Sequence, residues 1–315
     1  MMQRLRIPLL TLLVCGMVAP GSADDPCRCA LWIDLYRGEP VAHTEMLDDL
    51  AAARVVYLGE RHTLNRHHRI QAAVLEDLAD RGVQLVVGLE QMEANQQPAL
   101  DRFNLGAIDF DGLAKSTDWG RRWRGYDQYR PLLETARRLD IPVIALNARA
   151  ETIRQVFRSG GIDKLPPDLR GELPAEVDLE DPDYEKTLRM QMMVHASVDE
   201  GMLRSMVEAQ IARDEAMAAI LADYLKSPAG QGRTALVICG AGHVAYGLGT
   251  AARVERRLPE IRQRIVLLSE SGDVELSPEE TAMAREIVIT HEQLRQIARP
   301  IADYLHAKEP ARAEE

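Results

Sequence analysis

The stretch Arg54-Val-Val-Tyr-Leu-Gly-Glu-Arg-His62 joins a short apolar run to a polar end. A run in which apolar and polar residues do not alternate is typical of a strand buried on both faces, as in a parallel sheet. We therefore predict a buried strand at Arg54–Leu58. Four further stretches have the same character, and they predict four more strands: Leu85–Leu89, Val143–Leu146, Ala235–Cys239 and Ile265–Leu268.

Segments with helical spacing separate several of these strands. From Arg69, apolar residues recur at intervals of three and four until Gly82, and a second helix is predicted over Pro131–Leu139. Strands that alternate with helices favour right-handed crossovers in a covered parallel sheet. The sequence therefore predicts an α/β fold with a mainly parallel β-sheet flanked by helices.

The stretch of about residues 150–225 interrupts this rhythm. It contains no convincing strand, and a proline-bearing segment leads into a long methionine-rich run with helical spacing. We predict a smaller helical cap or insertion here, within a main domain over 47–272. In its helix Gln210 and Asp214 interrupt an apolar stripe, so they either brace the cap or face a cleft. Residues 24–46 are expected to be an N-terminal segment and 273–315 a C-terminal part, with a helix over Pro278–Leu305 and then a tail.

The first 23 residues have the order of a secretory signal peptide. Arg4 and Arg6 precede an apolar run, and small residues follow up to Ala23, where we expect cleavage. The run is shorter than the roughly 20 residues that span a bilayer. We therefore expect a periplasmic or secreted protein. Leu12-Leu-Val-Cys15 faintly resembles a lipoprotein box, so membrane anchoring through Cys15 is an alternative.

Composition excludes some classes of protein. The 315 residues carry 38 Lys plus Arg against 49 Asp plus Glu, a formal charge of −11. Nucleic acid is not expected as the main ligand, because neutralising phosphates needs a concentrated basic surface. Four cysteines are too few for a disulfide-dense module, and 46% hydrophobic residues suffice for a core.

Polar residues follow four of the predicted strands at the point where each ends. Parallel strands bring their carboxyl ends to one edge of the sheet, which is where open α/β sheets bind ligands. Gly59 is expected to let the chain turn sharply there. The polar residues are Glu60 and His62 after the first strand, Glu90 after the second, Asn147 after the third and His243 after the fourth.

Two chemistries suit Glu60, His62, Glu90 and His243. Imidazole and carboxylate groups can hold a divalent metal, or they can share general acid and base duties in activating water. Hydrolases use both of these chemistries. The alternative is that the carboxylates cap helices and the imidazoles satisfy backbone groups. His67 and His68 open the next helix and either extend this cluster or cap that helix.

The segment Trp119-Gly-Arg-Arg-Trp-Arg-Gly-Tyr-Asp-Gln-Tyr-Arg130 is the densest aromatic and cationic patch of the chain. A porphyrin needs an apolar plane, an axial ligand and cations for its propionates, and tyrosine can ligate ferric haem. Tyr126 and Tyr129 are candidate haem ligands, and Arg124 and Arg130 are candidate partners of the propionates. The alternative is a core-packing motif with solvated arginines.

Several motifs occur together in a fixed order: Gly59-Glu60-Arg61-His62, Leu89-Glu90, the segment 119–130 followed by Ala145-Leu146-Asn147, Gln210 with Asp214 and Met217-Ala218, and Gly242-His243-Val244. In this combination the chain resembles the ChaN-like haem-binding uptake family of the Tiki/TraB superfamily. The resemblance implies a parallel α/β domain with a smaller helical part, exported and often lipid-anchored. It also implies a homodimer that holds two haems face to face, with tyrosine on the iron.

The resemblance leaves the ligand and the activity open. Tyr126 and Tyr129 both lie in the matching aromatic segment, and Tyr246 and His195 are alternatives. The superfamily also includes hydrolases and metal-dependent proteases, which implies an ancestral catalytic edge at the four Glu and His residues. We favour a haem-binding protein of haem or iron uptake without turnover, with a hydrolase as the alternative.

Overall fold

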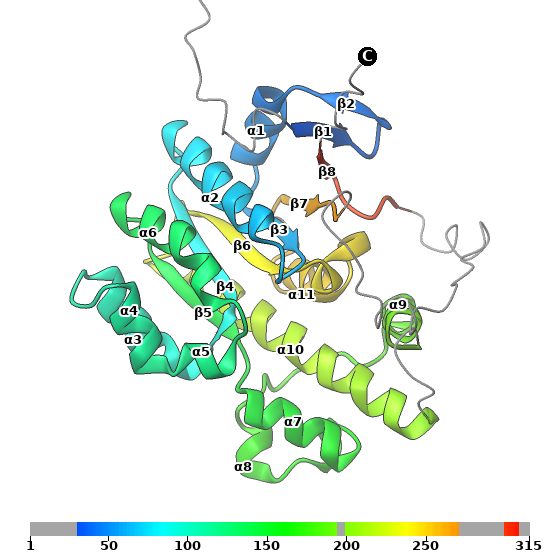
Figure 1. Ribbon diagram of the computed structural model, residues 1–315. Coiled ribbons are helices and arrows are strands. Elements are labelled where there is room, and N and C mark those ends of the chain that lie inside the picture. Colours follow the sequence, from blue (N-terminus) through cyan, green and yellow to red (C-terminus); the bar gives the residue numbers. More distant parts are fainter. Residues whose placement is uncertain (1–29, 194–198, 271–298, 309–315) are drawn as a thin grey trace, which may run out of the picture.

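The structure is a computed structural model, and it describes residues 30–193, 199–270 and 299–308. These residues form one eight-stranded sheet in the order β2-β1-β8-β7-β3-β6-β4-β5, drawn in Figure 1. Five neighbouring strands of this sheet are mutually parallel, and they confirm the five predicted strands. Their bounds are β3 (Val55–Glu60), β4 (Leu85–Glu93), β5 (Val143–Asn147), β6 (Thr234–Gly240) and β7 (Gln263–Leu268).

Three further strands extend one side of the sheet: β1 (Ala30–Asp34), β2 (Glu39–Val41) and β8 (Tyr304–Lys308). β1 runs antiparallel to both β2 and β8, whereas β8 is parallel to β7. The predicted helix over Pro278–Leu305 is therefore wrong at its end, because Tyr304 and Leu305 pair with Val266 and Leu267 in the sheet. The part of that prediction over 278–298 lies outside the described residues.

Helices cover both faces of the sheet, as predicted. In β3, Val56 and Leu58 face one apolar core, and Val55 and Tyr57 face the other, so both faces of the strand are buried. The first core is covered by α1 (His43–Ala51), α2 (Asn65–Asp80), α3 (Gln97–Asn104), α4 (Phe110–Thr117), α5 (Trp119–Arg122) and α6 (Arg130–Arg138). The second is covered by α10 (Glu200–Lys226) and α11 (Gly249–Arg257).

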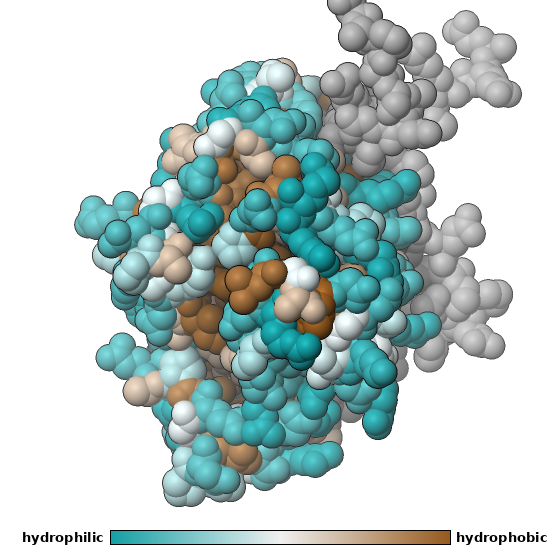
Figure 2. Space-filling model, turned by 90° about the vertical axis from the view of Figure 1, so that its left-hand side faces the viewer, coloured by the Kyte–Doolittle hydropathy of each residue, from teal (hydrophilic) through white to brown (hydrophobic). Residues whose placement is uncertain are grey.

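The outer surface of the first helical layer is mainly polar. Figure 2 shows the side of the molecule on which α3, α4 and α6 lie, and hydrophilic residues make up most of it. Apolar side chains appear there in separate patches, near the middle and toward the lower end. The helices therefore turn their apolar faces to the sheet, as expected for amphipathic helices over a core.

The predicted helical insertion is confirmed between β5 and β6. The described residues of this stretch form no strand, and α7 and α8 lie below α10 in Figure 1. Besides α10, its elements are α7 (Ala150–Ser159), η3 (Ile162–Lys164), α8 (Pro167–Arg170) and α9 (Pro182–Met193). None of the helices in the described ranges is both long and apolar enough to cross a bilayer.

Four short helical turns lie elsewhere along the chain, next to strand ends or helix starts. They are η1 (Ala94–Gln96), η2 (Tyr126–Tyr129), η4 (Ala241–His243) and η5 (Ala245–Gly247). η1 directly follows β4, and η4 directly follows β6. These two turns therefore begin where the parallel strands reach the carboxyl edge of the sheet.

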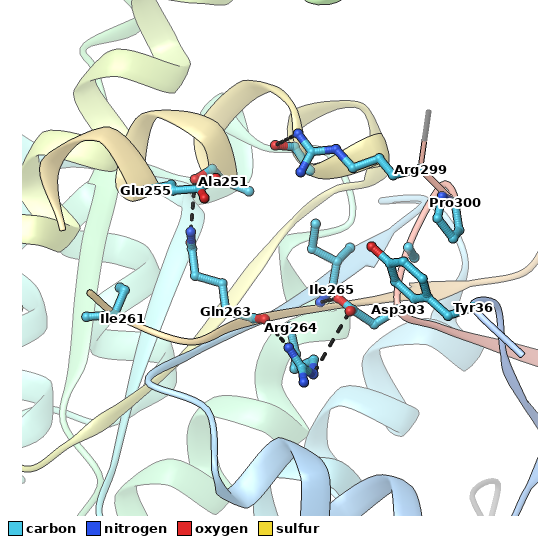
Figure 3. A pocket seen from close by; sticks show the side chains of 12 residues that line it. Tyr36, Ala251, Glu255, Ile261, Gln263, Arg264, Ile265, Arg299, Pro300 and Asp303 are labelled. Atoms are coloured by element: carbon cyan, nitrogen blue, oxygen red, sulfur yellow. Dashed lines mark hydrogen bonds and ion pairs between the residues drawn. The ribbon is translucent and has the colours of Figure 1, made fainter. Parts of the chain in front are cut away.

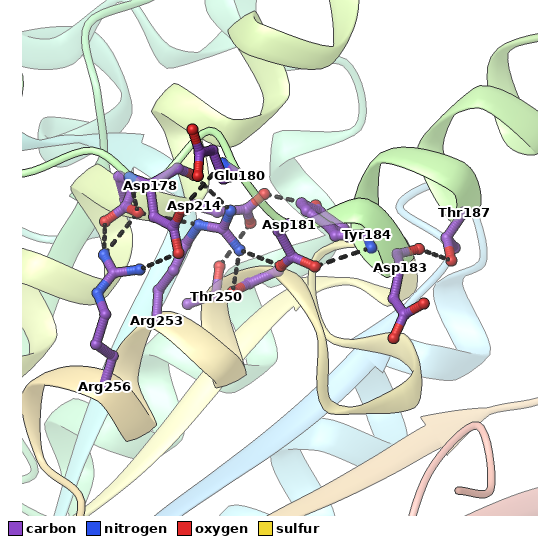
Figure 4. A network of polar contacts seen from close by, with 12 residues as sticks. Asp178, Glu180, Asp181, Asp183, Tyr184, Thr187, Asp214, Thr250, Arg253 and Arg256 are labelled. Atoms are coloured by element: carbon purple, nitrogen blue, oxygen red, sulfur yellow. Dashed lines mark hydrogen bonds and ion pairs between the residues drawn. The ribbon is translucent and has the colours of Figure 1, made fainter. Parts of the chain in front are cut away.

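Ion pairs fasten the insertion to α11. Figure 4 shows Arg253 and Arg256 of α11 reaching the loop before α9, where Arg256 bonds Asp178 at 3.2 Å. Both arginines also pair with Glu215 of α10, at 3.2 and 2.7 Å. Because the carboxylate of Glu215 is fully buried, these arginines supply the partners that a buried charge requires. The insertion is thus held against the main body of the molecule.

Candidate functional site

The carboxyl edge of the sheet brings the four predicted Glu and His residues together. Glu60 ends β3, Glu90 lies in β4, and His243 lies in η4 directly after β6. In the sheet β6 lies between β3 and β4, so three neighbouring strands deliver these side chains to one place. His62 follows β3 by two residues, and its ring lies between the two glutamates.

Glu60 is a buried carboxylate surrounded by donors. Its side chain is fully buried, and Oε1 lies 2.7 Å from His62 Nδ1. Burial alone raises the pKa of this carboxyl, but the hydrogen bonds from His62 and His68 outweigh burial and lower the pKa to about 2. Glu60 is therefore charged at neutral pH. Its oxygens contact donors on five side chains: His62, His68, Gln71, Gln91 and Tyr129.

His243 lies between two further carboxylates. Its Nδ1 is 2.7 Å from Asp214 Oδ1, and its Nε2 is 3.2 Å from Glu90 Oε1. Burial lowers the pKa of the imidazole, but the charges of Glu90 and Asp214 outweigh it and raise the pKa to about 10. Glu90 also accepts a hydrogen bond from the Gly240 N–H at 2.6 Å, and the pKa of Glu90 is lowered despite its burial. His243 is thus an imidazolium at neutral pH.

Asp214 anchors this end of the site from the helical insertion. Figure 4 shows Asp214 beside Tyr184 and Thr250, whose hydroxyls donate to it at 2.5 and 2.7 Å. Of the two roles expected for Asp214, bracing the cap fits its hydrogen bond with Tyr184 of α9, and the same buried carboxylate also holds His243 at the sheet edge. The Gln210 amide also contacts the His243 ring, at 3.0 Å from Nδ1.

Together these groups form a continuous row of alternating charge, here called the polar row: Asp214, His243, Glu90, His62 and Glu60. His62 joins the two glutamates, because its Nδ1 lies 2.7 Å from Glu60 Oε1 and its Nε2 lies 3.8 Å from Glu90 Oε1. The His62 side chain is 34% exposed, whereas that of His243 is 7% exposed. Solvent therefore meets the polar row at His62, beside the ring of Trp123 at 4.9 Å.

The polar row satisfies itself and leaves little for a metal. Among the described residues, no group of three or more His, Cys, Asp or Glu is arranged to hold a metal ion. The reason is chemical, because His243 bonds carboxylates through both ring nitrogens and Glu60 faces donors on both oxygens. A metal ligand needs a free electron pair directed at the ion. The geometry of Glu60, His62, Glu90 and His243 therefore does not fit the metal site that the sequence suggested as one alternative.

Glycines at the strand ends give the polar row its space. Gly59, expected to allow a sharp turn, lies inside β3 and does not have a positive φ. A Cβ there would overlap the Leu267 side chain and lie 3.2 Å from Ala241 Cα, so close packing explains this glycine. A Cβ at Gly240 would lie 3.0 Å from His62 Nε2. Both glycines permit the close approach of neighbouring strand ends.

The aromatic segment splits into a buried part and an accessible part. Tyr129 is fully buried and donates to Glu60, and burial raises the pKa of its phenol far above the usual range. Tyr126 is half-buried and stacks on Phe110 at 6.1 Å between ring centroids. Within the described ranges, the Tyr126 hydroxyl makes no hydrogen bond. Tyr129 thus belongs to the polar site, and Tyr126 is the tyrosine of this pair with an uncommitted oxygen.

The two candidate arginines also differ. Arg130 bonds Asp111 at 2.6 Å and Glu134 at 3.4 Å, so its charge is already paired. Arg124 is exposed and makes no ion pair in the part of the chain that the structure describes. Of the alternative ligands, Tyr246 is half-buried in η5 with a φ of 60°, and His195 lies outside the described residues.

Sequence reasoning missed the amides and hydroxyls that complete the site. Gln71 and Gln91 both donate to Glu60, at 2.5 and 3.1 Å, and both are buried. Gln71 carried a signal, because it lies one turn after His67 among the apolar positions of α2. Tyr184 and Thr250 carried none, since neither interrupts an apolar pattern. His67 and His68 are both buried, and His68 contacts Glu60 whereas His67 accepts from the Arg61 N–H.

A separate cavity of about 210 Å³ lies away from the polar row. Figure 3 shows that it is bordered by β7, α11 and the residues before β8, with Gln263, Arg264 and Asp303 among the side chains around it. None of the four predicted Glu and His residues lines it. This cavity is therefore a separate place from the polar row at the strand ends.

Comparison with known proteins places the fold. The structure is similar to a solved structure described as cofacial heme binding to ChaN of Campylobacter jejuni, with a TM-score of 0.65 and 17% sequence identity over 89% of this chain and 97% of that one. It is more distantly similar to a mutant erythromycin esterase EreC in its open conformation, with a TM-score of 0.43 and 13% identity over 75% and 76% of the two chains. A search of curated proteins finds no match.

A family model identifies the chain. The model described as haem-binding uptake, Tiki superfamily, ChaN matches residues 46–254, which include β3 to β6 and the whole polar row. The match agrees with the order of motifs read along the sequence and with the α/β fold. This chain belongs to the ChaN family of haem-binding uptake proteins in the Tiki superfamily.

Proposed function

We propose that the chain is an exported haem-binding protein that takes part in haem or iron uptake. The observation that carries this proposal is the family match over residues 46–254. Export is supported by the signal-like residues 1–23, which lie outside the described part of the chain. The family resemblance supports two further parts of the proposal. The chain forms a homodimer that holds two haems face to face, and Cys15 anchors it to a membrane in place of free secretion.

The side chains around Tyr126 fit haem. Its phenol oxygen is uncommitted within the described residues, and a phenolate is an established axial ligand of ferric haem. Exposed Arg124 can pair with a propionate, and half-buried Trp123 adds an aromatic surface nearby. Tyr129 and Arg130 do not fit, because Glu60 and Asp111 already engage them. Bound haem would supply a ferric iron and a visible absorption band, and this chain would supply the phenolate and the cation.

Replacing Tyr126 with phenylalanine is expected to weaken the binding of ferric haem by about tenfold or more and to shift the Soret band, because the variant lacks the axial oxygen. The measurement is a spectrophotometric titration of the purified mature chain with ferric haem. Tyr36→Phe is the matched control, since Tyr36 is 64% exposed and lies in the loop between β1 and β2. A Tyr126→Phe spectrum and affinity equal to those of the control would contradict this assignment.

Hydrolysis at the polar row is a second candidate function. The observation that favours it is the half-exposed imidazole of His62, whose Nδ1 lies 2.7 Å from the buried Glu60 carboxylate. Such a pair orients the imidazole, as a general base requires, and the other ring nitrogen, Nε2, lies 3.8 Å from Glu90 Oε1. Burial lowers the pKa of His62, but the hydrogen bond that His62 donates to Glu60 and the charge of Glu90 outweigh burial and raise the pKa, so the neutral base forms only at higher pH.

His62→Gln is therefore expected to abolish any turnover of a panel of esters and peptides, by at least about a hundredfold. The activity of the unaltered chain should rise with pH as His62 loses its proton. Arg124→Gln is a control at a neighbouring exposed side chain. Turnover that survives in His62→Gln, or a panel without turnover, would remove hydrolysis as a function of this site.

A further inference from the structure

A small cavity adjoins the polar row at the ends of β4 and β5. Its volume is about 110 Å³, and Glu90 of the polar row forms part of its wall. The volume has room for several waters, since one water needs roughly 10–15 Å³ measured in this way. It is far too small for a porphyrin. This space, here called the edge cavity, therefore takes a ligand other than haem, although Trp123 lines it and also lies in the segment proposed to contact haem.

Four residues that line the edge cavity have a buried side-chain polar atom without a hydrogen-bond partner among the described residues. One is the indole N–H of Trp123, a donor, and the other three atoms are oxygens. These oxygens belong to Gln91, Glu93 and Asn147, which are 4%, 8% and 8% exposed. The orientation of each amide is fixed by its nitrogen, because Gln91 donates to Glu60 at 3.1 Å and Asn147 donates to the Glu90 carbonyl at 2.9 Å. A buried acceptor without a donor is unfavourable, because it has lost its hydrogen bonds to water. The wall therefore favours a ligand that brings N–H or O–H donors to these oxygens and an acceptor to the Trp123 N–H.

Two arginines, Arg122 and Arg213, add positive charge to the wall of the edge cavity. Arg122 is committed, because it bonds Glu93 at 2.7 Å and lies 3.5 Å from Glu151. Arg213 of α10 is half-buried in the same wall and makes no ion pair with any other described residue. A half-buried guanidinium favours a carboxylate partner, which it can hold by two parallel hydrogen bonds. The edge cavity thus combines uncommitted acceptors with one uncommitted cation.

We propose that the edge cavity binds a small free α-amino acid as its zwitterion. The ammonium group donates to the oxygens of Gln91, Glu93 and Asn147, and the carboxylate pairs with Arg213. The size of the cavity restricts the side chain to that of glycine, alanine or serine. No bond is made or broken in this binding step.

The test is thermal unfolding and calorimetric titration of the mature chain without haem, using glycine and L-alanine as probes. Both are expected to raise Tm by binding the folded state. Acetate and methylamine, which carry one charge each, are expected to bind at least about tenfold more weakly, because each lacks one half of the contacts. L-Phenylalanine is expected not to bind, because its ring exceeds the cavity.

Arg213→Met is expected to weaken glycine binding by about tenfold or more, since it removes the partner of the carboxylate. Arg158→Met is the matched control, because Arg158 is exposed on α7 and does not line the edge cavity. Glu93→Gln, which keeps the shape of the wall, provides an independent variant in which the ammonium is bound more weakly. Three results would overturn the proposal: glycine without effect, an Arg213→Met variant that binds like the control, or methylamine or MgCl₂ alone matching glycine. A negative result here leaves the haem titration unaffected, so the two proposals fail separately.

Discussion

Glu60→Ala is expected to lower the free energy of unfolding by about 3–5 kcal/mol, the cost of breaking a buried ion pair by removing one partner. The variant removes the acceptor shared by Tyr129, two amides and two imidazoles at the end of β3. Each buried donor left without a partner adds a desolvation cost. The carboxylate of Glu60 is therefore expected to be as important for stability as the apolar side chains of the strand that carries it.

The measurement is urea unfolding at pH 7, followed by circular dichroism. Glu134→Ala is the matched control, because Glu134 is 54% exposed and forms a surface pair with Arg130. Surface pairs contribute about 0–1 kcal/mol, so the control should unfold close to the unaltered chain. A Glu60→Ala variant as stable as the Glu134→Ala variant would show that the donors around Glu60 find other partners.

Stability is expected to fall between about pH 6.5 and 10 as His243 loses its proton. The pKa of His243 is raised from 6.5 to about 10 in the folded state, so the folded protein holds this proton more tightly than the unfolded chain. The resulting stabilisation is complete below pH 6.5 and disappears as the pH approaches 10. Its size is on the order of 5 kcal/mol, from 1.36 kcal/mol for each pH unit.

Acid is expected to destabilise the folded protein by protonating Glu60, at the other end of the polar row from Asp214 and His243. The folded-state pKa of Glu60 is lowered from 4.5 to about 2, so its contribution is complete above pH 4.5 and is lost as the pH falls toward 2. The polar row thus stabilises the fold most between about pH 4.5 and 6.5. Urea unfolding at a series of pH values measures both limbs. His243→Gln should lack the alkaline limb that His243 provides, and an equal alkaline slope in both proteins would contradict this account.

The sequence was most informative where burial is complete. The five predicted strands are apolar throughout because helices cover both faces of the sheet, and a strand with one solvated face would alternate instead. β1, β2 and β8 escaped prediction because they lie at one side of the sheet, where pairing with neighbours rather than an apolar run defines them. For the start of β8, helical spacing was a misleading guide, since Tyr304 pairs in register with Asp34.

The polar row could be anticipated only in part. Parallel strands and the position of each polar residue after its strand were enough to place Glu60, Glu90 and His243 at one edge. The contribution of Asp214 depends on how α10 crosses that edge, which helical spacing does not specify. Nor does spacing separate Tyr126 from Tyr129, because the two lie in one turn, η2, and differ only in the direction of their side chains.

The same geometry explains why ion pairing dominates over metal binding at the strand ends. Asp214, Glu90 and Glu60 alternate with His243 and His62, so each charge has an opposite neighbour within 3.8 Å. Alternation compensates the cost of burying these charges, which would otherwise be several kcal/mol for each. Only His62 combines membership of the polar row with substantial exposure, and chemistry at this edge therefore has to pass through His62.

The ionisation of His243 is the most direct test of this arrangement, because the charge of the polar row depends on it. Nitrogen NMR of the imidazole rings, assigned by comparison with His243→Gln, reports how many ring nitrogens carry a proton. We expect both nitrogens of His243 to be protonated at pH 8, with titration only near pH 10. A neutral His243 ring at pH 8 that titrates near pH 6.5 would contradict the polar row as described here.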